Sequence, residues 1–254
     1  MKNQNIFIYN DTFTSLLNLV KILMKKRIIP FNIKSTNYSP NLLDKIINIE
    51  VTDDESIIKE IIDKVGNKIF NTIYYIFLSN DENKEIIIYY FLAHSLKYKN
   101  KIFYMRNLKS VNKALQISKY VSHECHKFKG FLRFKELENK ILYAEIAPES
   151  DITFLLSKHF KERLKNEYWI IKDTKRGIIS LYDKNNFYIT DDKNFTLLTT
   201  KLSSKELTIE DMWKSFYKTI GIEERKNDRC RMNFMPKKYW KYIIEMSDEL
   251  EKSN

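Results

Sequence analysis

An eight-residue stretch, HECHKFKG at positions 123–130, gathers residue types that are rare in this chain. It holds two of the four histidines, one of the two cysteines and one of the four glycines of the 254-residue sequence. Histidine and cysteine bind transition metals, and histidine also titrates near neutral pH. The stretch could therefore hold a metal or exchange a proton, or it could simply be the end of a helix.

The spacing of the two histidines argues against a metal site. A zinc-protease helix places its histidines four residues apart, with a glutamate free to act as base, whereas His123 and His126 are only three apart. A closed zinc site needs four N or S ligands. Because Cys125 falls on the apolar side of the expected helix, further ligands would have to come from His159 or Cys230. We therefore predict neither a metal site nor a cofactor.

A catalytic role for His126 stays open. Histidine can serve as a general acid or base, and a neighbouring carboxylate could orient it. The sequence contains no G-x-S-x-G nucleophile motif to accompany it. His94 and His159 lie in apolar helical segments, where a structural role is the simpler expectation.

Positive charge is concentrated in two segments of the chain, which carries a net +11. Residues 97–140 contain twelve Lys and Arg against three Glu, a net of +9, and residues 214–241 contain nine against three acidic residues, a net of +6. The remainder has a net charge of −4. Localised charge is what a polyanion-binding surface requires. A lysine excess that merely follows from biased codon usage remains the simpler alternative.

The first basic segment contains the run KFKGFLRF, residues 127–134. We expect Phe131 and Arg133 on one face of a β-hairpin, where they could stack on a base and contact phosphates. Packing of Phe131 on the other domain is an equal alternative. The run shares only its first three positions with the RNA-recognition signature, because Leu132 stands where a small residue is needed.

The second basic segment ends in RMNFMPKKYWKYI, which mixes cations with Phe234, Tyr239 and Trp240. Pro236 is expected to begin a helix, and the free amides of a helix start favour an anion. A solvated basic face over a Trp240 core anchor is the alternative.

The apolar pattern predicts an α+β protein, with helices packed on short, mostly antiparallel strands. Residues 1–107 form a mainly helical part that opens with a short strand, 108–247 a core domain that carries the motifs, and 248–254 a tail. We expect strands at 5–10, 47–51, 131–137, 141–147, 168–173, 177–183 and 186–190, and helices after 12 and 52 and at 67–79, 84–99, 110–130, 148–164, 204–221 and 236–246.

We expect a cytoplasmic protein without a membrane partner. The most apolar stretch, IIIYYFLAHSL at 86–96, is too short to span a bilayer. The opening MKNQNIFIYNDT lacks the apolar run of a signal peptide. Two cysteines without a secretory context indicate free thiols in a reducing compartment.

Three ordered segments resemble a bacterial DNA-metabolism or DNA-repair family of unknown biochemical activity, a domain of unknown function. They are HECHKFKGFLRF, the stretch from ILYAEIAPESD to IISLYD, and the stretch from WKSFYKTIGIEERK to MPKKYW, within residues 108–245. Phe128 and Leu132 depart from the family pattern. The resemblance carries over His126, Gly130, Phe131, Arg133, Phe134, Pro148, Trp169, Asp173, Arg176, Met235, Pro236, Tyr239 and Trp240.

The resemblance implies a DNA context, because members are encoded beside a radical S-adenosylmethionine protein and the domain also occurs fused to uracil-DNA glycosylase-like proteins. We therefore expect a DNA repair or DNA metabolism protein that binds nucleic acid, with a radical S-adenosylmethionine protein as a partner. An enzyme acting on damaged DNA bases or backbone through His126 and Arg133, and a non-catalytic protein–protein adaptor, are the alternatives. The predicted nucleic-acid-binding residues are Lys127, Lys129, Phe131, Arg133, Arg176, Arg225, Arg229, Arg231, Lys237 and Lys238.

Overall fold

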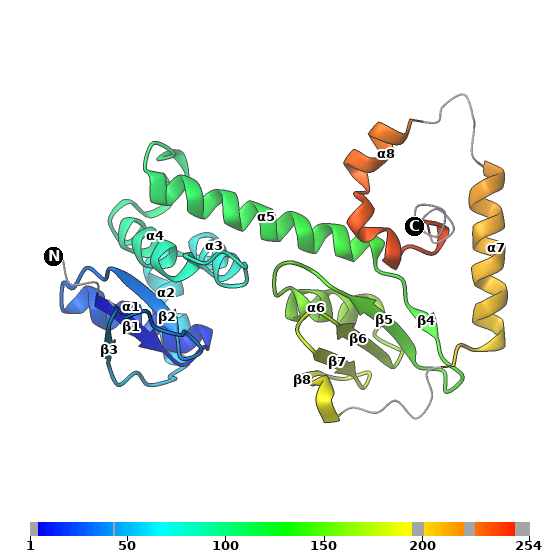
Figure 1. Ribbon diagram of the computed structural model, residues 1–254, viewed down its shortest axis with the longest axis horizontal. Helices are drawn as coiled ribbons and strands as arrows, with labels where there is room; N and C mark the ends of the chain where they lie inside the picture. Colours follow the sequence, from blue (N-terminus) through cyan, green and yellow to red (C-terminus); the bar gives the residue numbers. More distant parts are fainter. Residues whose placement is uncertain (1–4, 43, 195–200, 221–226, 247–254) are drawn as a thin grey trace. The chain divides into compact units, whose positions relative to one another are not determined.

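The computed structural model describes residues 5–42, 44–194, 201–220 and 227–246. It divides into two compact units, Met1–His123 (unit 1) and Glu124–Asn254 (unit 2), and the helix α5 (Lys109–Phe131) contributes residues to both. Helices and two small sheets make up the fold, so the predicted α+β class is confirmed (Figure 1).

Unit 1 is built on a three-stranded parallel sheet. Its order is β2-β1-β3, with the apolar strand β1 in the centre, where Phe7 and Tyr9 are buried. The sequence predicted β1 and, shifted by a few residues, β3, but not β2, in which Ile33 is the sole buried side chain. The strands are β1 (Asn5–Tyr9), β2 (Asn32–Ser35) and β3 (Lys45–Asn48).

The helices of unit 1 follow the predicted pattern closely. Thr12 caps the first helix by accepting a hydrogen bond from the Ser15 amide at 3.1 Å. α3 and α4 pack against each other, which confirms the predicted helical hairpin. No helix of the described residues is both long and apolar enough to cross a membrane. The helices are α1 (Phe13–Lys25), α2 (Ser56–Val65), α3 (Asn67–Phe77), α4 (Lys84–Tyr98) and the 3₁₀ helix η1 (Lys99–Tyr104).

Unit 2 contains a five-stranded mixed sheet in the order β4-β5-β6-β7-β8. Its strands pair antiparallel except for β5 and β6, which run parallel and are joined by α6 (Thr153–Arg163). In the core, Trp169 stacks on Tyr182 with ring centroids 5.0 Å apart. The strands are β4 (Lys135–Glu136), β5 (Leu142–Ile146), β6 (Trp169–Asp173), β7 (Ile178–Tyr182) and β8 (Phe187–Asp191).

The predicted boundaries around the two basic segments are partly wrong. α5 continues through Gly130 to Phe131, so the strand expected from 131 shrinks to β4. The expected long C-terminal helix is instead a pair of short 3₁₀ helices. The basic connection before these 3₁₀ helices contains a short helix that was not predicted. The helix predicted from residue 204 is confirmed. These elements are α7 (Ser204–Ile220), α8 (Asp228–Phe234), η4 (Lys237–Tyr242) and η5 (Ile244–Met246), and a further 3₁₀ turn, η2, covers Asp192–Asn194.

A buried carboxyl group joins α4 to the central strand of unit 1. Glu85 is 5% exposed, and its Oε1 accepts a hydrogen bond from the Tyr9 hydroxyl at 3.2 Å. Its Oε2 has no hydrogen-bond partner among the described residues. Burial raises the pKa of Glu85 above its ordinary value, although Lys84 and Lys34 favour the ionised form. Ionising this carboxyl group therefore opposes folding of unit 1.

We predict that Glu85→Gln flattens the pH dependence of unit 1 stability. The pKa of Glu85 is higher in the folded than in the unfolded state, so wild-type stability is full at low pH and falls as the pH rises above the ordinary glutamate value of 4.5. The difference between the folded and unfolded pKa values sets the size of this loss. Hydrogen exchange of β1 and α4 amides at several pH values, corrected for intrinsic rates, measures it, with the exposed Glu55→Gln as control. Parallel pH profiles for wild type and Glu85→Gln would contradict the prediction.

Candidate functional site

Within unit 2, the two basic segments meet at the C-terminal end of α5. Phe128 and Phe131 of α5 pack on Tyr239 of η4, with ring centroids 5.2 and 5.5 Å away. Phe128 also contacts the ring of Tyr242, at 5.8 Å. Tyr239 is 4% exposed, so it joins η4 to α5 as part of the core. Segments more than a hundred positions apart in the chain therefore pack against each other (Figure 1).

Cations lie over the aromatic rings of η4. A cation within about 6 Å of a ring centroid is attracted by the electron-rich ring face. The closest is the Lys241 Nζ, 4.7 Å from the Tyr242 centroid. We call this surface the basic face, and its members are Lys127 (5.7 Å) and Lys238 (5.1 Å) over Tyr239, Arg231 (5.0 Å) and Lys237 (5.6 Å) over Trp240, and Lys241 over Tyr242.

Trp240 is the structural anchor of the basic face. It is 3% exposed, and its indole Nε1 donates a hydrogen bond to the Met235 carbonyl at 2.8 Å. A ring that is buried and covered by cations offers no open side to a nucleic acid base. Trp240 is therefore a core anchor, as the alternative interpretation of the sequence had it. The exposed cations of the basic face are Lys237, Lys238 and Lys241. Lys127 and Arg231 are half-buried, and Arg231 also forms an ion pair with Asp228 at 3.0 Å.

The predicted hairpin surface of Phe131 and Arg133 does not form. Phe131 is the last residue of α5 and packs on Tyr239 of the same unit, so neither the hairpin nor the predicted packing on the other domain describes it. Arg133 follows the helix, and its Nη1 donates to the Gly130 carbonyl at 2.9 Å. Lys129 is half-buried nearer the interior, where its charge helps to lower the pKa of His159, after the larger effect of burial.

Arg176 holds a loop of unit 2 in place. Its Nη1 donates to the Asp173 Oδ2 at 2.9 Å and to the Pro148 carbonyl at 3.1 Å, while its Nη2 donates to the Glu149 carbonyl at 2.6 Å. Asp173 is fully buried and also accepts the Lys175 amide at 3.0 Å. These bonds give Arg176 a structural role, which is separate from its predicted role in binding nucleic acid.

Glu124, in the middle of HECH, clamps the same loop from the side of α5. Its two carboxylate oxygens accept the amides of Glu149 and Ser150, each at 2.9 Å, and the side chain is 3% exposed. The sequence suggested no such role. An acidic residue between cysteine and histidine on a helix with an apolar stripe was the available signal. We call Glu124, Asp173, Arg176 and the loop 148–150 the loop clamp.

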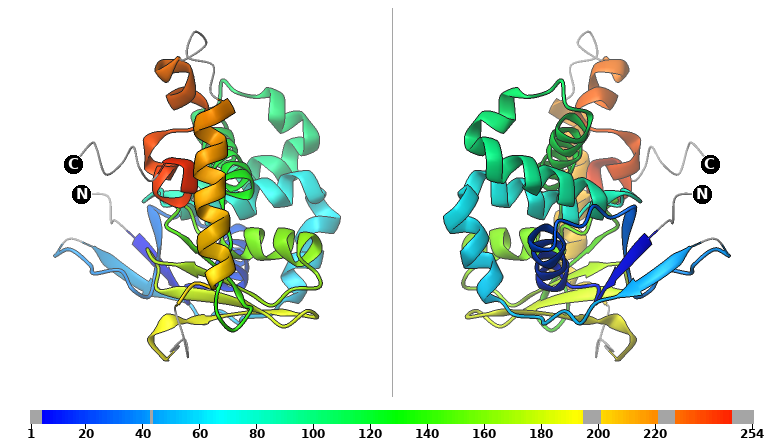
Figure 2. Two further views of the ribbon diagram at one scale, coloured as in Figure 1. Left: turned by 90° about the vertical axis from the view of Figure 1, so that its right-hand side faces the viewer. Right: turned by 90° about the vertical axis from the view of Figure 1, so that its left-hand side faces the viewer.

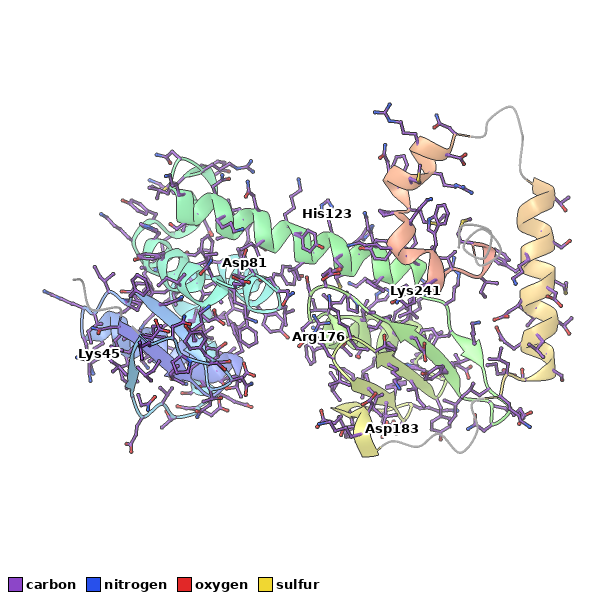
Figure 3. The ribbon with its side chains drawn as sticks, viewed as in Figure 1. Lys45, Asp81, His123, Arg176, Asp183 and Lys241 are labelled. Carbon is purple, nitrogen blue, oxygen red and sulfur yellow. The ribbon has the colours of Figure 1, made fainter. Side chains whose placement is uncertain are left out.

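The loop clamp adjoins the basic face. An ion pair with Lys175 lowers the pKa of Glu149, and the charges of Lys238 and Arg176 lower it further. Glu149 is exposed, so solvent screens these effects. Figure 3 labels Arg176, in the turn between β6 and β7, and Lys241, in η4. The charge of Lys238 therefore influences Glu149, which lies in the loop that Arg176 holds in place.

The other predicted residues are dispersed. His126 is exposed on α5, and Arg229 is exposed on α8. Arg225 lies outside the described residues. Cys125 is buried, which raises the pKa of its thiol, and Cys230 is exposed; both are free thiols. In the part of the chain that the structure describes, His, Cys, Asp and Glu side chains form no group of three or more that could hold a metal ion.

We predict that Glu124→Gln destabilises unit 2 by about 1–3 kcal/mol. An amide has one acceptor oxygen, so one of the two clamped amides would face an NH₂ group instead of a carboxylate oxygen. Urea unfolding followed by tryptophan fluorescence measures the change, since all three tryptophans belong to unit 2. The exposed Glu162→Gln on α6 is the matched control and should stay within about 0.5 kcal/mol of wild type. Equal midpoints for both variants would show that the clamp contributes nothing.

Comparisons with known proteins place the chain in a family. Comparison with curated proteins and with solved structures found no significant match in either case. A family model described as a domain of unknown function, DUF4130, matches residues 82–245. The match includes the whole of α5, the sheet of unit 2, and the basic face. Because it covers well over half of the chain, this protein belongs to the DUF4130 family.

Proposed function

We propose that this protein binds nucleic acid through the basic face of unit 2. The supporting observation is the convergence of the two basic segments: Lys127 comes from the first, and Arg231, Lys237, Lys238 and Lys241 come from the second. Cations gathered on one surface raise the local positive potential and attract polyanions. A merely lysine-rich chain has no need to bring them together.

The chemistry of the basic face favours contacts to phosphates over contacts to bases. Lys237, Lys238 and Lys241 are exposed, whereas the rings of Tyr239 and Trp240 are buried beneath cations. Lysine acts on phosphate as a flexible point charge. Binding of this kind positions a nucleic acid without reading its sequence. We therefore propose sequence-independent binding of the backbone.

DNA is the nucleic acid we propose, in repair or other DNA metabolism, with a radical S-adenosylmethionine protein as a partner. The support is the resemblance of the three motif segments to a DNA-metabolism family. The chain has two cysteines and no C-x-x-x-C-x-x-C cluster motif, so any radical chemistry would be the partner's.

A binding titration over several salt concentrations tests the proposal. Fluorescently labelled single-stranded, duplex and uracil-containing DNA of one length would be titrated with the full chain between about 50 and 200 mM salt. We expect dissociation constants of about 10⁻⁴ to 10⁻⁶ M at physiological salt and a steep linear loss of log K with log salt. Uracil should have little effect if the backbone is the ligand. Absent or salt-independent binding would overturn the proposal.

We predict that Lys237→Gln/Lys241→Gln lowers the salt slope for duplex DNA by about two. Each lysine that neutralises a phosphate contributes about 0.9 to the slope. Lys165→Gln/Lys184→Gln is the matched control, because it removes two charges from exposed lysines of unit 2 that do not belong to the basic face. Its slope should stay close to wild type. Equal slopes for the two double variants would mean that net charge, and not the basic face, governs binding.

A further inference from the structure

α7 carries a stripe of exposed apolar side chains. Ile209, Met212, Trp213 and Phe216 are 46%, 66%, 42% and 52% exposed. Their spacing of i, i+3, i+4 and i+7 gathers them within about 100° of the helix circumference. The Trp213 and Phe216 rings also contact each other, with centroids 5.7 Å apart. We call these four residues the apolar stripe.

The apolar stripe is distinct from the side of α7 that faces its own sheet. Glu206 accepts the Glu136 amide at 3.0 Å, and Glu210 forms an ion pair with Lys135 at 2.7 Å. These two acidic residues are four positions apart, and they attach one side of α7 to β4. Figures 1 and 2 show α7 along the outside of unit 2. α7 also packs on η5. Beside these contacts, the four side chains of the stripe remain 42–66% exposed.

We propose that the apolar stripe pairs with the same stripe of a second copy of this chain, with the two α7 helices antiparallel. The stripe is symmetric about its centre between Met212 and Trp213. A two-fold axis there sets Ile209 opposite Phe216 of the second copy, and Met212 opposite Trp213 of the second copy. Each contact joins an aliphatic side chain to an aromatic one, and methionine sulfur packs well on aromatic rings. This self-complementarity is what a two-fold interface requires.

The charge at the end of the stripe fits the same arrangement. Lys205, exposed at the start of α7, continues the stripe by one turn. The same axis sets it opposite position 220, the last residue of α7 in the second copy. A lysine near a helix C-terminus is attracted by the negative end of the helix dipole. In a parallel pair the two Lys205 side chains would instead face each other.

The size of the stripe predicts a weak dimer. Large apolar side chains have roughly 150–250 Å² of surface, so four half-exposed ones offer on the order of 400 Å² per copy. A standard stable interface buries about 800 Å² per partner. We therefore expect reversible association with a dissociation constant in the micromolar range or above. The inference is independent of nucleic acid binding.

Sedimentation velocity of the full chain, without nucleic acid, from about 1 to about 200 µM tests the proposal across micromolar affinity. Wild type should rise from the 30.7 kDa of one chain toward twice that mass. Met212→Glu/Phe216→Glu should stay monomeric over the whole range. Leu207→Glu is the matched control, since Leu207 is 51% exposed on another side of α7 and should leave association unchanged. Far-UV circular dichroism confirms that each variant is folded.

Lys205→Glu tests the antiparallel direction. Reversing this charge next to a helix C-terminus should weaken association about two- to tenfold over the two symmetric contacts. Unchanged or tighter association would overturn the antiparallel arrangement. A monomeric wild type at every concentration, or equal loss of association in Leu207→Glu and Met212→Glu/Phe216→Glu, would overturn the proposal as a whole and leave the stripe to a different protein partner.

Discussion

The buried carboxylate of Glu124 fixes the arrangement on which the basic face depends. A buried charge is costly unless hydrogen bonds satisfy it, and Glu124 is satisfied by two backbone amides of the loop 148–150. Arg176 holds the same loop through its carbonyls, while Asp173 balances the guanidinium charge. The end of α5 is thereby tied to the sheet of unit 2. Phe128 and Phe131 at that end of α5 pack on Tyr239 of η4. The loop clamp that holds α5 therefore also helps to position η4.

Local patterns predicted most elements but not their partners. Periodic apolar residues located α1, α3, α4 and the strands β6 to β8. The strand β2 was not predicted, because a single buried isoleucine in four residues gives no alternation of apolar and polar side chains. The helix between β5 and β6 was expected at 148–164, but the sequence did not reveal that these two strands are neighbours paired in parallel. Gly130 suggested a helix end, yet the helix includes it, since glycine permits but does not require an αL conformation.

The sequence predicted which segments supply the cations of the candidate site, but not how the side chains of the site are arranged. Counting charges identified the two basic segments, including Lys241, and the sequence correctly left Trp240 open as a core anchor. It could not show that Phe131 belongs to a helix or that Arg176 is committed to Pro148 and Glu149, because both depend on contacts between distant segments. The rare residues of HECH drew attention for their metal chemistry. The structural role belongs to the glutamate between them, whose partners lie 25 and 26 residues further along the chain.

Cation–aromatic contacts explain how like charges can gather at one surface without losing their charge. An ion pair such as Lys135 with Glu210 neutralises the lysine, so it adds little to the surface potential. A lysine over a neutral ring gains attraction from the ring while keeping its full charge. Lys127 lies over Tyr239 and Lys237 over Trp240 in this way, whereas Arg231, also over Trp240, pairs with Asp228 at 3.0 Å. The same rings are the core contacts that hold η4 on α5. Packing of the aromatic side chains therefore offsets the repulsion among the cations, and the surface keeps the charge that a polyanion would recognise.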